Sequence, residues 1–127
     1  MIWILPAVIV PLVILFCGIL YATYPPKKIN FLYGYRTKKS MLNNDIWTTA
    51  NSLAAKSLII VQVSILIIII VIALLERTHI IKLFSKATDF YLVSMVVSTV
   101  SVLLPIFIVE FELKKQFYKD GTRKISK

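Results

Sequence analysis

The segment from Ser57 to Leu75 contains no charged side chain, and its second half, from Ile65 to Leu75, has no polar side-chain atom. A helix needs about 20 mainly apolar residues to cross the roughly 30 Å hydrocarbon core of a bilayer. A water-soluble domain would instead spread its apolar residues at a helical or strand period. This segment therefore predicts a membrane-spanning helix, and the bilayer is the solvent in which the rest of the chain has to fold.

Two further apolar blocks have the length of a span, one from Ile2 to about Tyr24 and one from Phe90 to Val109. The first ends at Pro25-Pro26, because proline disfavours helical geometry in the residue before it. Pro11 and Pro105 each remove a backbone hydrogen bond and predict kinks. No pattern typical of signal-peptide cleavage follows the first block, so we expect it to be retained as a helix. The prediction is an all-α membrane protein with three transmembrane helices in a single domain, residues 1–127.

The basic residues lie outside the apolar blocks and are distributed unevenly. Of the fifteen Lys and Arg, the segment between the first two spans carries six, the tail from residue 110 to residue 127 carries six, and the second loop carries three. Cytoplasmic loops carry an excess of Lys and Arg. We therefore expect the first loop and the tail in the cytoplasm, with the N-terminus and the second loop outside. The formal charge of +9 then favours attachment to the membrane surface, and no direct binding of nucleic acid is expected.

The three predicted spans contain no Asp, Glu, His, Lys or Arg between their ends. Catalysis needs convergent acid, base, nucleophile or metal groups, and a proton-coupled transporter keeps an intramembrane carboxylate as its relay. Cys17 is the only cysteine, and the single His79 is far from it in sequence, so neither a disulfide nor a metal-ligand spacing is present. The sequence therefore predicts no enzymatic activity and no cofactor, and it disfavours a proton-coupled transporter.

Residues 30–56, which we name the motif segment, combine aromatic, cationic and amide side chains. Gly34 lies between Tyr33 and Tyr35, where it can adopt a positive φ or let another backbone approach closely. Arg36 offers five donors in a planar fork that suits a phosphate, a carboxylate or carbonyl groups. The simpler alternative is that this loop only anchors the protein at headgroup level.

The end of the motif segment has the features of a helix that continues into the second span. Ser40 resembles an N-cap, and the acid and amides that follow it are favoured in a first helical turn. Trp47, Asn51 and Gln62 then recur at helical spacing and share one face. Asn51 can either pack between helices or contact a ligand, whereas packing is the favoured role of Gln62.

A second polar face is predicted on the third span. Ser94, Ser98 and Ser101 recur at steps of four and three residues. We expect this face to meet the polar stripe of the second helix in a compact bundle. Beyond the third span the chain stays in helical register as far as Lys115, and the tail from Lys119 is expected to fray.

The motif segment resembles the signature of the SdpI family of membrane proteins. The resemblance rests on Asn30, Tyr33-Gly34-Tyr35-Arg36-Thr37, Ser40, Asn43 or Asn44, Trp47, Ala50-Asn51 and Lys56. It implies a multi-pass protein of the bacterial cell membrane that protects its producer from a secreted sporulation-delaying peptide toxin. The residues expected to contact a ligand are then Asn30, Tyr33, Gly34, Tyr35, Arg36, Thr37, Trp47, Asn51 and Lys56.

Two classes of function fit these features. An immunity protein would capture or exclude a peptide toxin, with Arg36, Trp47 and Asn51 forming one recognition cluster. A transport or lipid-handling component would instead bind a lipid headgroup at the Arg36 loop. The expected partners are membrane lipids, a secreted peptide toxin and further copies of this chain. The resemblance implies one further partner, a transcriptional repressor held at the membrane.

Overall fold

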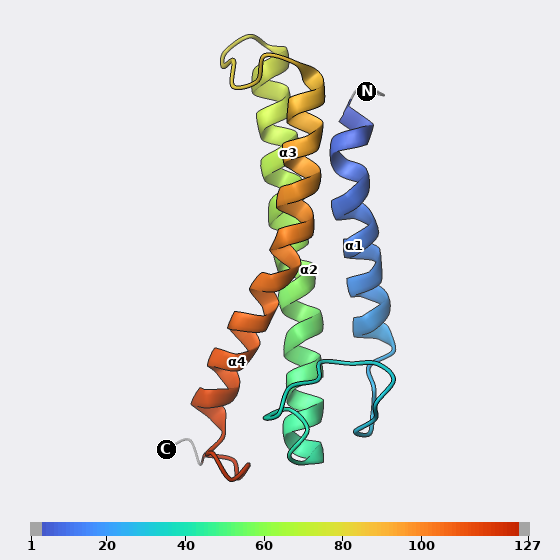
Figure 1. The fold of residues 1–127 in the computed structure, drawn as a ribbon, viewed down its shortest axis with the longest axis vertical. Helices are drawn as coiled ribbons and strands as arrows, with labels where there is room; N and C mark the ends of the chain where they lie inside the picture. The colour runs from blue at the N-terminus through green and yellow to red at the C-terminus, as the bar shows by residue number, and fades with distance from the viewer. Residues whose placement is uncertain (1–3, 125–127) are drawn as a thin grey trace.

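The computed structural model describes residues 4–124, which form a bundle of long helices (Figure 1). The helices are α1 (Leu5–Thr23), α2 (Asn44–Arg77), α3 (Ala87–Val100) and α4 (Leu104–Gln116), with a 3-10 turn at Ser101–Leu103. α3, the turn and α4 follow one another directly and form the third apolar helix, Ala87–Gln116. Three helices are thus long and apolar enough to cross a membrane, which confirms the predicted all-α fold.

The loops gather at the two ends of the bundle (Figure 1). The connection between α1 and α2 lies at the same end as the tail that follows α4, and we name this the loop end. The connection between α2 and α3 lies at the other end, near the start of α1. Residues 24–43 join α1 to α2, and we name them the motif loop. The motif loop and the tail share one side of the bundle, as three spans require.

α2 begins at Asn44, so the prediction of a helix start at Ser40 was wrong. Asn43 is the N-cap, and its Oδ1 accepts a hydrogen bond from the Ile46 amide at 2.9 Å. Ser40 closes a turn instead, because its Oγ accepts from the Thr37 amide and donates to the Tyr35 carbonyl, both at 2.8 Å. From Asn44 the helix is unbroken to Arg77, so the end of the motif segment and the second span are one helix.

The third apolar helix breaks before Pro105, as predicted. Pro105 is buried in the first turn of α4, and the three residues before α4 form the 3-10 turn because proline has no amide hydrogen to donate. α4 leans away from the line of α3 (Figure 1). At the break, Gln62 Nε2 donates to Ser101 Oγ at 2.9 Å, and both side chains are buried. The predicted contact between the two polar faces is therefore present.

Two apolar clusters hold the helices together, one at each end of the bundle. The cluster at the loop end joins α2 to α4 and contains Ile46, Ala50, Ala54, Val109, Leu113 and Phe117. The cluster at the other end joins α1, α2 and α3 and contains Ala7, Val8, Ile69, Ala73 and Phe90. Alanine supplies close approach in both clusters, as small residues do between membrane helices.

The tail folds back onto the start of α2, so the prediction that it frays was wrong for the residues described. Arg123 donates to both carboxylate oxygens of Asp45, at 2.8 and 3.1 Å, and its guanidinium lies 4.9 Å from the centroid of the Phe117 ring. The Asn43 side chain donates to the Gly121 carbonyl at 2.8 Å. The hydrogen bonds to Asp45 raise the pKa of Arg123 above its ordinary value. These contacts form a latch between residues 43–45 and the tail.

Replacing Arg123 with alanine should release the tail and leave the bundle folded. Both side chains of the ion pair are 53% exposed, and exposed pairs contribute only about 0.2–1 kcal/mol. We expect faster amide hydrogen exchange across residues 117–124 and an almost unchanged Tm. Lys119→Ala removes the same charge from the tail without touching the latch and should exchange like the wild type. Unchanged exchange in Arg123→Ala would show that the latch does not hold the tail.

Candidate functional site

Asn51 lies fully buried where α1, α2 and the motif loop meet. Its Oδ1 accepts hydrogen bonds from the Tyr21 hydroxyl of α1 and from the Tyr35 backbone amide, the latter at 2.8 Å. Its Nδ2 donates to the Trp47 carbonyl at 2.7 Å. The Tyr35 amide also donates to the Tyr21 hydroxyl oxygen at 3.0 Å. One side chain thus ties the loop to two helices.

Trp47 and Gly34 pack the loop against α2. The Trp47 side chain is fully buried, and its Nε1 donates to the Pro26 carbonyl at 2.9 Å. Gly34 has a φ of +120°, which L side chains rarely adopt. A Cβ at Gly34 would lie 2.7 Å from Asn51 Oδ1 and 3.1 Å from Trp47 Cη2. The position therefore requires glycine both for its backbone angle and for close approach.

Tyr35 attaches the loop to α4. Its hydroxyl donates to Glu110 Oε1 at 3.0 Å and also lies within 3.3 Å of the Ile106 carbonyl. Burial and the hydrogen bond to the Glu110 carboxylate raise the pKa of Tyr35. The phenol therefore stays protonated and keeps donating. The loop is in this way held by α1, α2 and α4 together.

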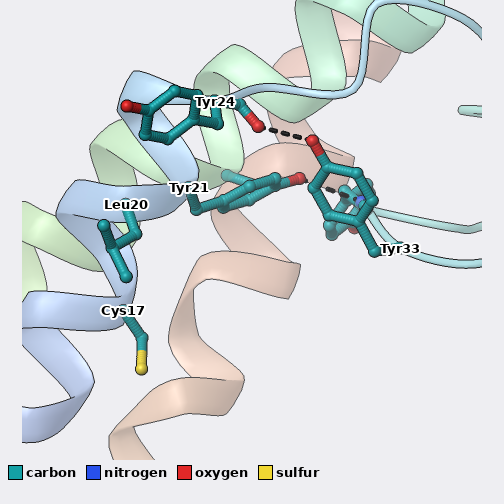
Figure 2. Close-up of a pocket in the computed structure, with 8 residues that line it drawn as sticks. Cys17, Leu20, Tyr21, Tyr24 and Tyr33 are labelled. Atoms are coloured by element: carbon teal, nitrogen blue, oxygen red, sulfur yellow. Dashed lines mark hydrogen bonds between the residues drawn. The ribbon is translucent and has the colours of Figure 1, made fainter.

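An apolar pocket of about 610 Å³ lies beside this network (Figure 2). It is lined by Cys17, Leu20, Tyr21, Tyr24, Tyr33, Gly34, Tyr35 and Ala54. The Tyr33 ring meets Tyr21 edge-on, with 6.4 Å between ring centroids, and the Tyr33 hydroxyl donates to the Tyr24 carbonyl. Small-molecule and peptide side-chain sites commonly have this size and this apolar character with a few placed polar groups. We name it the tyrosine pocket.

A family model described as the SdpI/YfhL protein family matches residues 27–109. The chain belongs to the SdpI/YfhL family. The match covers the motif segment and the second span and ends within α4, so it confirms the resemblance found in the motif residues. The uncharacterized protein YfhL of Bacillus subtilis (strain 168) is 46% identical over 43 residues, which are 34% of this chain and 39% of YfhL. The match thus spans well under two thirds of YfhL. No solved structure matches the chain.

The SdpI/YfhL signature residues have different roles in the structure. Tyr33, Gly34 and Tyr35 line the tyrosine pocket. Trp47 and Asn51 are fully buried and position the loop. Their role as direct ligand contacts stays a prediction, since every described contact of these two side chains is internal to the fold.

Arg36 is placed apart from the cluster predicted for it. Its side chain is exposed, and Nη1 donates to the Phe31 carbonyl at 2.6 Å. The Trp47 side chain is fully buried, so its ring has no exposed face on which a guanidinium could stack. The structure therefore brings Trp47 and Asn51 together but does not add Arg36 to them.

Three further signature residues lie outside the tyrosine pocket. Asn30 Oδ1 accepts the amides of Leu32 and Tyr33, both at 3.0 Å, and so shapes the turn before Gly34. Thr37 Oγ1 accepts the Ser40 amide at 3.2 Å. Lys56 is exposed and borders a separate cavity of about 240 Å³ between α1 and α2.

Sequence reasoning missed the α1 wall of the pocket. The ligand contacts predicted from the sequence include none of Cys17, Tyr21 and Tyr24, which line the pocket. The spacing of Cys17, Tyr21 and Tyr24 at four and three residues does place them on one helix face. That spacing, at the end of a span that leads into the motif segment, was the available signal.

Proposed function

We propose that this SdpI/YfhL protein is an immunity protein that protects a bacterial cell from a membrane-active peptide toxin. The observation that carries the proposal is that signature residues of the family build one wall of the tyrosine pocket. Tyr33, Gly34 and Tyr35 form that wall, and the buried Asn51 holds the Tyr35 amide by a hydrogen bond. This arrangement supports a role for the motif in a binding cavity, in place of simple anchoring at headgroup level.

The tyrosine pocket suits an apolar side chain of a peptide that lies in the membrane interface. Tyrosine offers an apolar ring face and a polar edge, and it favours the boundary between hydrocarbon and headgroups. Tyr24 at the rim is 70% exposed and Leu20 is 44% exposed, so the rim can be reached by a peptide within the bilayer. A bound toxin would be withheld from the oligomers or lipid contacts that damage the membrane.

Lipid handling is the second candidate, because the same apolar pocket would also accept an acyl chain. The two candidates differ in what the cell gains. An immunity protein raises survival in toxin, whereas a lipid-handling protein changes lipid distribution whether or not toxin is present.

Expression in a toxin-sensitive bacterium tests the proposal. Cells producing the wild-type chain should tolerate more of the sporulation-delaying peptide, or of another secreted membrane-active peptide in a panel, than cells without it. Tyr24→Ala removes an aromatic side chain that lines the pocket and makes no described hydrogen bond. It should lower the tolerated toxin concentration by about tenfold, which is the usual effect of removing an aromatic contact residue.

Phe16→Ala is the matched control, since Phe16 is an exposed aromatic residue of α1, the helix that Tyr24 caps, and lies outside the pocket lining. It should protect like the wild type. The proposal would be lost if normally inserted wild-type protein gave no protection against any peptide of the panel. Equal protection by Tyr24→Ala and Phe16→Ala would show that the tyrosine pocket takes no part in protection.

We propose further that the loop end faces the cytoplasm, because twelve of the fifteen Lys and Arg lie in residues 27–56 and 110–127. Cysteine labelling of intact cells tests this in a Cys17→Ser background. Lys82→Cys should react with an impermeant reagent, and Lys38→Cys should react only after permeabilisation. The reverse labelling pattern would show that the protein has the opposite orientation in the membrane. In the proposed orientation the tyrosine pocket meets a toxin that has reached the inner leaflet.

A further inference from the structure

A second cavity at the loop end, of about 590 Å³, is lined by lysines from three separate parts of the chain. The turn before α2 contributes Lys38 and Lys39, α4 contributes Lys114, and the tail contributes Lys119 and Lys124. Leu42, Phe117 and Tyr118 complete the lining. None of these residues lines the tyrosine pocket, so the two cavities are distinct sites. We name the second one the lysine cleft.

Neighbouring carboxylates offset only part of the positive charge of the lysine cleft, chiefly Glu110 beside Lys39. Lys115 pairs with Glu112 and Arg123 pairs with Asp45, and neither of these ion pairs includes a lysine of the cleft. Burial and the charge of Lys124 lower the pKa of Lys39, with Glu110 opposing and Lys114 adding to this shift. The cleft therefore holds several cations close together.

Two of these ammonium groups are oriented by backbone carbonyls. Lys39 Nζ donates to the Phe117 carbonyl at 3.3 Å, and Lys124 Nζ donates to the Lys114 carbonyl at 2.8 Å. An ammonium has three N–H donors, so both groups keep donors for a bound anion. Charge-assisted hydrogen bonds from lysine to phosphate are shorter and stronger than neutral ones. The chemistry of the cleft thus favours a phosphate.

We propose that the lysine cleft binds the phosphate of an anionic phospholipid headgroup, with phosphatidylglycerol as the simplest example. The assignment goes beyond the proposed toxin protection and does not depend on it. The place of the cleft in the fold argues for a lipid rather than a soluble anion. Lys114 lies five residues beyond Val109, where the apolar run of α4 ends, and Phe111 between them is 68% exposed, so we place the cleft at the edge of the hydrocarbon.

The apolar part of the lining supports the same ligand. Leu42, Phe117 and Tyr118 provide walls for the glycerol and the first carbons of an acyl chain, which a free phosphate would not need. Basic pockets at the cytoplasmic ends of membrane helices recognise anionic headgroups in this way. The latch between Arg123 and Asp45 brings Lys119 and Lys124 to the cleft, so the docked tail completes the site.

The test uses the purified full-length protein in a neutral detergent, titrated with short-chain phosphatidylglycerol and with phosphatidylcholine of the same chain length. Phosphatidylglycerol should bind more tightly. Lys38→Gln combined with Lys119→Gln removes two exposed lysines of the cleft, and the affinity for phosphatidylglycerol should fall by about 25-fold, or about fivefold per lysine.

Lys27→Gln combined with Lys28→Gln is the matched control, because it removes the same charge from two exposed lysines of the first loop outside the cleft. It should keep the wild-type affinity. Equal affinity for phosphatidylglycerol and phosphatidylcholine would overturn the assignment. An equal loss of phosphatidylglycerol affinity in the two double variants would also overturn it, because it would mean general attraction to the charged surface. Inorganic phosphate that bound as tightly as phosphatidylglycerol would make the cleft a free-phosphate site and refute the lipid assignment.

Discussion

Replacing Gly34 with alanine should disrupt the motif loop and abolish protection while the helices still insert. A φ of +120° in a residue with a side chain costs about 1–3 kcal/mol. The added Cβ would also lie 2.7 Å from Asn51 Oδ1 and 2.9 Å from Pro26 Cγ. Neither neighbour can move away cheaply, because Asn51 is held by Tyr21 and Trp47, and Pro26 by the Trp47 indole. We expect a clearly lower Tm in detergent and survival in toxin no better than without the protein.

Gly18→Ala is the matched control for this substitution. Gly18 is also buried and lies within α1, but the nearest atoms to a Cβ there would be side-chain atoms of Ile59 and Leu58, at 3.3 to 3.5 Å. Flexible side chains can yield by a few tenths of an ångström, and alanine suits a helix better than glycine. Gly18→Ala should therefore stay near the wild type. If both variants kept full stability and protection, the tight packing of the loop at Gly34 would be refuted.

Asn51→Ala should lower stability and toxin protection about as much as Gly34→Ala, because it removes the side chain that joins the motif loop, α1 and α2. The change leaves the Tyr35 amide and the Tyr21 hydroxyl to share one remaining hydrogen bond in a buried place. Each buried polar group that loses its partner costs about 1–3 kcal/mol. We expect a lower Tm, faster hydrogen exchange at Tyr35 and a loss of toxin protection.

The control for Asn51→Ala is Asn44→Ala, since Asn44 is an exposed residue of the same helix. Tyr21→Phe provides an intermediate step, because it deletes one donor to Asn51 and leaves the ring in the wall of the tyrosine pocket. The expected order of stability is wild type and Asn44→Ala, then Tyr21→Phe, then Asn51→Ala. Equal stability of Asn44→Ala and Asn51→Ala would show that the network at Asn51 does not hold the loop.

The spans were predictable because the bilayer imposes a strict requirement on them. In lipid every backbone polar group needs an internal partner, so a long apolar block has to be a helix. The break at Pro105 was predictable for an equally local reason, the missing amide hydrogen. The contact of Gln62 with Ser101 followed from the helical spacing of polar residues, which have to face protein when lipid surrounds the bundle.

The contacts of the loop and the tail were not predictable, because they join residues far apart in the sequence. Nothing local indicates that Tyr21 reaches Asn51 or that Arg123 reaches Asp45. Arg36 shows the opposite error, since its chemistry suits a binding cluster but its guanidinium has a closer partner in the carbonyl of Phe31. The predicted helix cap at Ser40 was wrong for a similar reason, because the Ser40 hydroxyl donates to the nearby Tyr35 carbonyl in a turn.

Site-specific photocrosslinking at the tyrosine pocket tests the proposed function most directly. A photoreactive phenylalanine derivative would replace Tyr33 in the pocket wall or, as the control, Phe107, which is 72% exposed on α4 and does not line the pocket. Membranes from protected cells would be irradiated with the peptide against which the protein confers survival. We predict a crosslink to the peptide from position 33 and none from position 107. Protected cells that show no crosslink from position 33, or equal crosslinks from both positions, would contradict toxin capture in the tyrosine pocket.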